Sequence, residues 1–242
     1  MKKLLSLLLV IVLSFLLTAC VDVYSSVDDY QIIYDNVEKA NKTFTKSGKK
    51  ETLLEFDEYA YCSYLLLFPR QTPEKLTNFE YSWYQLIDYD DYYIFFTYEL
   101  DETEFGEFEQ SLSEFSVSYK GQTNKPVYTE TLFEYPTYIL SWTNEVEYGG
   151  TCEFIMLDES THTVVNVYKL GYDFETCQGK AEYNITPVDN NFDAVEQLCG
   201  YKEFRVGSKC GFTVYSFLDE NNGWFAPDVD ELVYDNKFLN LV

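Results

Sequence analysis

Apolar and polar positions follow a helical period in two parts of the chain. A first helix is predicted from Ser26, a suitable N-cap, with Asp28 and Asp29 in its first turn. Its apolar stripe consists of Tyr30, Ile33, Tyr34, Val37 and Ala40. The run Asp101-Glu102-Thr103-Glu104 has the pattern of a capping box and predicts a second helix. The apolar face of this second helix is Phe105, Phe108, Leu112 and Phe115.

Most of the remaining chain shows strand-type patterns. The clearest hairpin is predicted from two apolar runs on either side of the polar turn 158–162. A polar loop is expected over 120–125, and a tight turn at Asn222-Gly223. A short third helix is expected over 191–199, with Phe192, Val195 and Cys199 inward. The predicted strands are 59–68, 79–87, 92–100, 117–119, 127–133, 137–143, 152–157, 163–170 and 212–218.

These elements predict the fold class and the domain division. Strands come in hairpin-linked blocks, and helices stand between the blocks. This order is typical of an α+β fold with an antiparallel sheet and two or three short packed helices. We expect a main ectodomain over residues 27–170 and an appended subdomain over residues 171–242.

The first twenty residues have a different character from the rest. Lys2 and Lys3 precede an apolar run of 14 residues from Leu4 to Leu17. The run ends in the motif Leu17-Thr18-Ala19-Cys20. A cationic start, an apolar run and a small-residue cleavage site are typical of a secretory signal. The last four residues resemble the lipobox of bacterial lipoproteins. That resemblance covers the leader only and implies diacylglycerol on the Cys20 sulfur and cleavage between Ala19 and Cys20.

The leader therefore predicts where the protein lies. Residues 1–19 are expected to be cleaved, and residues 20–26 to form a short tether behind the lipidated Cys20. Two acyl chains suffice for stable attachment. No second apolar run approaches the length of a membrane span. We expect a lipid-anchored protein on the extracytoplasmic face of the cell membrane.

Composition restricts the partners. Removal of residues 1–19 deletes two of the 17 basic residues and none of the 41 acidic ones, which leaves a formal charge of −26. Such a balance argues against nucleic acid, because phosphates need a basic surface. Aromatic residues make up 19% of the chain, so the acidity does not indicate a disordered tail.

Five cysteines remain after Cys20. An exported chain can form disulfides, and the odd number leaves at least one thiol outside an intramolecular pair. The expected pairs are Cys199–Cys210 and Cys152–Cys177, although spacing alone does not fix connectivity. Cys62, inside an apolar run, is the expected buried free thiol.

The residues give little sign of catalysis. His162, the only histidine, lies in a Ser/Thr-rich turn and is expected to be exposed. The chain has no GxSxG elbow, CxxC pair, phosphate loop or dinucleotide fingerprint, so no cofactor or metal is expected. Adjacent carboxylates are common, but 41 acidic residues make them unavoidable.

Tryptophan provides the one candidate for ligand contact. Trp83 and Trp142 lie in predicted strands and are expected in the core, whereas Trp224 follows the Asn222-Gly223 turn and is expected to be exposed. The sequence favours a non-enzymatic protein that binds a protein, peptide or glycan. The alternative is an envelope hydrolase that uses carboxylates alone.

Overall fold

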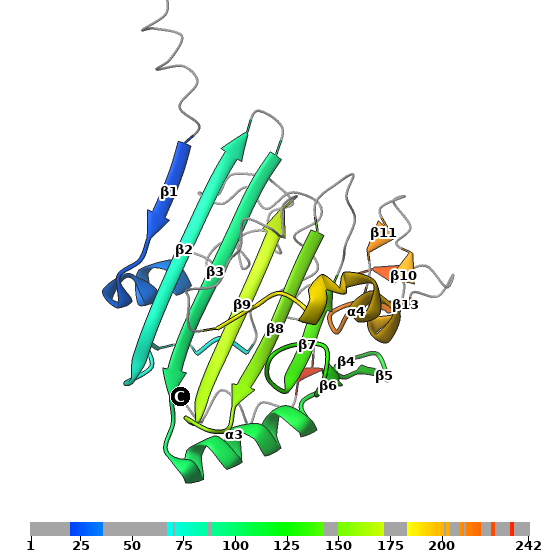
Figure 1. Ribbon diagram of the computed structural model, residues 1–242. Helices are drawn as coiled ribbons and strands as arrows, with labels where there is room; N and C mark the ends of the chain where they lie inside the picture. Colours follow the sequence, from blue (N-terminus) through cyan, green and yellow to red (C-terminus); the bar gives the residue numbers. More distant parts are fainter. Residues whose placement is uncertain are drawn as a thin grey trace, which may run out of the picture.

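The chain is described by a computed structural model (Figure 1). The described residues are 20–35, 67–69, 71–86, 89–142, 150–171, 183–200, 202–203, 209–210, 212–218, 224–225 and 233–234.

One antiparallel sheet of eight strands dominates the structure (Figure 1). The strand order is β1-β2-β3-β9-β8-β7-β12, and β6 also pairs with β7. The strands are β1 (Cys20–Tyr24), β2 (Leu76–Leu86), β3 (Tyr89–Glu99), β6 (Val127–Thr129), β7 (Thr137–Trp142), β8 (Gly150–Asp158), β9 (Thr163–Gly171) and β12 (Phe212–Thr213). With the helices described below, this arrangement confirms the predicted α+β class.

Both faces of the central strands are covered. Phe95 and Phe96 are consecutive in β3, so their side chains point to opposite faces, and both are fully buried. On the Phe96 face, the Tyr30 ring lies 5.0 Å from that of Phe96 and 5.6 Å from that of Phe79. On the other face, Phe133 packs at 4.9 Å from Phe154. The sheet is therefore the middle layer of the core.

The three predicted helices begin where the sequence places them. Ser26 caps η1 (Val27–Asp29) by accepting a hydrogen bond from the Asp28 amide at 3.3 Å, and helical backbone continues over 30–35. The other helices are α3 (Glu102–Glu114), η3 (Val188–Asn190) and α4 (Phe192–Cys199). Val195 of α4 is buried, and Gly200, with φ 74°, ends the helix.

Helix α3 crosses the end of the sheet where β3 terminates (Figure 1). The Asp101 carboxylate accepts from the amides of Thr103 and Glu104 at 2.9 and 2.8 Å, and the Glu104 carboxylate accepts from the Asp101 amide at 3.0 Å. This reciprocal pair is the predicted capping box. The inward side chains Phe105, Phe108 and Leu112 are buried, as expected.

Short strands complete the chain. They are β4 (Val117–Tyr119), β5 (Gln122–Asn124) and β15 (Val233–Tyr234) in one small sheet, and the pairs β10 (Lys202–Glu203) with β11 (Lys209–Cys210) and β13 (Phe217–Leu218) with β14 (Trp224–Phe225). The predicted loop over 120–125 is wrong in part, because residues 122–124 pair with β4. Lys120 and Gly121 have φ values of 45° and 83°, so two left-handed residues form the connecting turn.

Several predicted strands differ in extent. The strand expected over 127–133 ends at Thr129, and that over 212–218 is divided between β12 and β13. Of the strand expected over 59–68, residues 59–66 lie outside the described residues, and Leu67 and Phe68 are buried at a turn. Strands from both sides of the expected division at residue 171 share hydrogen bonds, since β12 pairs with β7 and β15 with β4.

Candidate functional site

The expected lipidation residue, Cys20, is the first residue of β1. Its register partner is Gln85 of β2, and the ladder continues to Tyr24 opposite Tyr81. The structure thus differs from the tether expected over 20–26, because 20–24 is an edge strand. Valine at two of its five positions and a terminal tyrosine suit a strand, which explains the pairing. A lipid on Cys20 would be attached directly to the sheet.

The segment after β1 is fastened to the core. The Tyr30 hydroxyl donates to the backbone oxygen of Pro69 at 2.7 Å, and the Thr72 amide donates to the Gln31 side chain at 3.0 Å. Burial, followed by the neighbouring tyrosines 98 and 34, raises the pKa of Tyr30 well above its usual range. The tyrosine therefore stays neutral and keeps its donated hydrogen bond.

His162 lies in the β8–β9 turn, with φ 55°, and its ring is 5.4 Å from that of Phe105. The expected turn position is confirmed, but the ring is half-buried on α3 rather than exposed. Its backbone oxygen accepts from the Leu100 amide at 3.0 Å. In this position the residue joins the turn to the start of α3.

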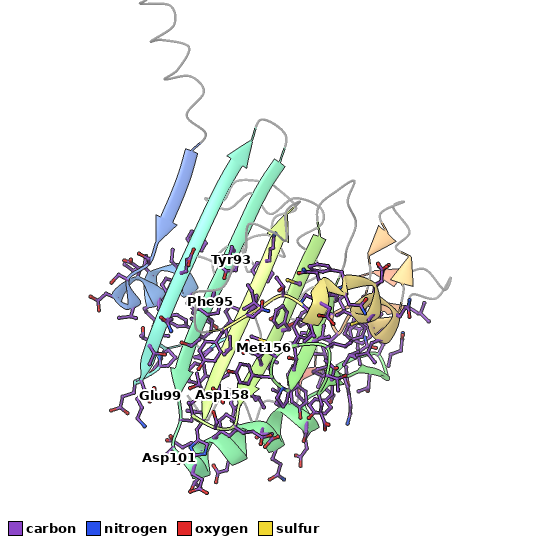
Figure 2. The ribbon with its side chains drawn as sticks, viewed as in Figure 1. Tyr93, Phe95, Glu99, Asp101, Met156 and Asp158 are labelled. Atoms are coloured by element: carbon purple, nitrogen blue, oxygen red, sulfur yellow. The ribbon has the colours of Figure 1, made fainter. Side chains whose placement is uncertain are left out.

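Asp158 organises the same turn. It accepts from the amide and hydroxyl of Ser160 at 2.9 and 2.6 Å and from the Thr161 hydroxyl at 2.8 Å. Burial alone would raise the pKa of Asp158, but these hydrogen bonds outweigh burial and lower it. Figure 2 shows Asp158 with Glu99 and Asp101 at the α3 end of the sheet, away from the start of β1.

A second carboxyl is buried inside the molecule. Glu153, in the middle of β8, is 1% exposed and accepts from the Tyr215 hydroxyl at 3.0 Å. Tyr215 follows β12, so this contact joins the C-terminal segment to the main sheet. The sequence shows an acid inside an apolar strand at Glu153, but only the fold shows its partner.

The same segment is held by two amide side chains. Asn124 donates to the backbone oxygens of Val214 and Ser216 at 3.2 and 2.6 Å. Gln122 exchanges two hydrogen bonds with the backbone of Leu218, at 2.7 and 3.0 Å. These contacts give the polar strand β5 a structural role.

Among the described residues, no group of three or more His, Cys, Asp or Glu side chains is placed to hold a metal ion.

The three tryptophans occupy different positions. Trp142 is 1% exposed and packs against Phe133 and Phe154, which confirms its predicted place in the core. Trp83 is in β2 opposite Tyr92, and Trp224 is in β14 opposite Leu218. The side chains of Trp83 and Trp224 lie outside the described part of the structure, so the exposure of Trp224 stays a prediction.

The cysteines correct one expectation. Cys199 carries a free thiol, so the predicted Cys199–Cys210 disulfide is wrong. The Cys199 side chain packs half-buried against the hydrophobic core at the end of α4, and this burial raises its pKa to about 12. Cys152 is fully buried in β8. Its expected partner Cys177, like Cys62, lies outside the described residues.

Comparison with known proteins gives no relative. No family model, curated protein or solved structure matches this chain. Within the described ranges, none of the helices has the length and apolar character needed to cross a bilayer.

Proposed function

We propose that this chain is a bacterial lipoprotein, anchored to the extracytoplasmic face of the cell membrane by diacylglycerol on Cys20. The observation that carries the proposal is Leu17-Thr18-Ala19-Cys20 at the end of a 14-residue apolar run with a cationic start.

The proposed role of the ectodomain is binding of a protein, peptide or glycan without catalysis. The hydrogen bonds of Asp101, Glu153 and Asp158 serve the fold: they cap a helix, join the C-terminal segment to the sheet and order a turn. The ring of His162, the only histidine, packs on Phe105. These environments favour structural roles for the groups most suited to acid–base chemistry.

Fatty-acid labelling of the full chain in a bacterial host tests the anchor. Cys20→Ala should abolish the label and leave the precursor uncut or released from membranes, because the thioether cannot form. Cys199→Ala is the matched control and should keep the label. A Cys20→Ala variant that is still labelled and membrane-bound, with its leader removed, would contradict the proposal.

Ligand screens test the binding role. The intact ectodomain and its Trp224→Ala variant should be compared against envelope glycans and proteins, and weaker binding of the variant would assign the contact to Trp224. Turnover of an envelope polymer, abolished by replacement of a carboxylate, would instead favour the hydrolase.

A further inference from the structure

The end of the sheet next to Cys20 carries aromatic residues on both β2 and β3. Three successive rungs across β1, β2 and β3 are Cys20–Gln85–Asp90, Val21–Tyr84–Asp91 and Asp22–Trp83–Tyr92. The rung beyond them pairs Leu86 with Tyr89. We name Trp83, Tyr84, Tyr89 and Tyr92 the aromatic end. All four lie within three rungs of the residue that would carry the lipid.

The register leaves no free chain between the lipid and this end. A tether of six residues would let the domain move about 20 Å from the bilayer. With Cys20 hydrogen-bonded into the β1–β2 ladder, the acyl chains leave the protein at the same level as Gln85 and Asp90. The anchored sheet must therefore meet the membrane at this end.

The residue types suit the layer that they would meet. Tyr and Trp concentrate at membrane–water interfaces, where the ring lies among the headgroups and its polar atom remains hydrated. Asp22, Asp90 and Asp91 occupy the same rungs. Carboxylates are excluded from the hydrocarbon core, so these three residues limit the depth to the headgroup level.

We propose that the aromatic end rests in the headgroup region of the bilayer and directs α3 away from the membrane. This inference rests on the proposed lipidation of Cys20. Figure 1 shows the start of β1 and α3 at opposite ends of the sheet. From Asp90 to Glu99 the strand rises about 30 Å, several times the headgroup layer of about 5–7 Å. Lipid contact belongs to one end, and the α3 end is left for partners in solution.

The native tryptophans allow a direct test. The full lipidated chain would be reconstituted in phosphatidylcholine vesicles, some with a nitroxide close to the lipid headgroup. All variants carry Trp224→Phe. The Trp83 signal is the difference in fluorescence between this background and the same background with Trp83→Phe. The nitroxide should remove most of the Trp83 signal, whereas the buried Trp142 should keep its emission. Strong quenching of Trp83 would also show that the core position predicted for this residue from the sequence is wrong.

A tryptophan at position 106 is the distal control. Gly106 is exposed on α3, and a Cβ there would meet nothing within 4 Å, so Gly106→Trp fits the helix. In the Trp83→Phe background, its emission should be unchanged by the nitroxide. Near-UV circular dichroism checks that each variant keeps its aromatic packing.

The outcomes separate this inference from the anchor itself. If the chain is acylated and bound to vesicles but its Trp83 signal is not quenched, the placement of the aromatic end is wrong and the anchor stands. Equal quenching of Trp83 and Gly106→Trp would also overturn it, because the domain would then lie in no fixed orientation. Absence of diacylglycerol on Cys20, seen by mass spectrometry, would overturn the anchor and the placement together.

Discussion

The hydrogen bond between Tyr215 and Glu153 predicts how strongly the C-terminal segment depends on the sheet. Tyr215→Phe removes one oxygen atom and leaves a buried carboxyl short of one donor. Loss of the donor leaves this buried acceptor unsatisfied, which costs about 1–3 kcal/mol. Pairing of β12 and the amides of Gln122 and Asn124 still hold the segment. We therefore expect a loss of about 2 kcal/mol without release of the segment.

Urea unfolding of the unlipidated chain, starting at residue 20 with Cys20→Ser, would measure this loss. A loss of about 2 kcal/mol lowers the melting temperature by about 4–8 °C in a chain of this size. With a slope of about 3 kcal/mol/M, the urea midpoint should fall by about 0.7 M. Glu153→Gln in the same chain and the double variant complete a cycle that isolates the contact.

The chain offers a matched control for the same chemistry at the surface. Tyr128 is exposed, and its hydroxyl donates to Glu130 at 3.2 Å. Because water replaces an exposed partner, Tyr128→Phe should change the free energy of unfolding by no more than about 0.5 kcal/mol. If Tyr215→Phe costs no more than Tyr128→Phe, the buried contact does not hold the C-terminal segment.

Two further predictions concern the thiol and the turn. Because burial raises the pKa of Cys199 to about 12, this thiol should resist alkylation at pH 8 in the folded chain and react after denaturation; rapid labelling of native protein, located by mass spectrometry, would refute its burial. The folded pKa of Asp158 is lowered, so its contribution to stability is complete above its unfolded pKa of about 3.9 and is lost as the pH falls through the folded value. Asp158→Asn should flatten the dependence of unfolding free energy on pH below about 4, and an unchanged slope in urea titrations would argue against the turn assignment.

Local patterns were sufficient for the helices and hairpins. The capping box of Asp101 and Glu104 and the apolar face of α3 depend on residues within a few positions of each other. The β8–β9 hairpin has strong apolar runs on both sides of a polar turn. In these elements the interactions that decide the structure occur between residues of one short stretch of sequence.

The features that the sequence did not reveal depend on distant partners. β1 has five residues and becomes a strand only through β2, more than fifty residues later. β5 consists of polar residues, so its sequence does not have the apolar pattern of a strand. Its amide side chains hydrogen-bond to the backbone of residues 214–218. Whether the Cys199 thiol is free depends on how α4 packs. The spacing between cysteines in the sequence does not show this packing. The leader motif, by contrast, is a local signal, and the lipidation that it predicts awaits the labelling experiment.

The strand order also sets the sequence of events in folding. The sheet takes one edge from the start of the chain, β1, and closes the other at Ser141 and Trp142 with β12, seventy residues further on. Until residue 212 has been made and exported, β7 therefore presents open backbone donors and acceptors there, and such an edge can pair with another chain. Loop closure over this separation slows the final step relative to the central hairpins. A chain truncated before β12 should consequently be more prone to aggregation than the complete one.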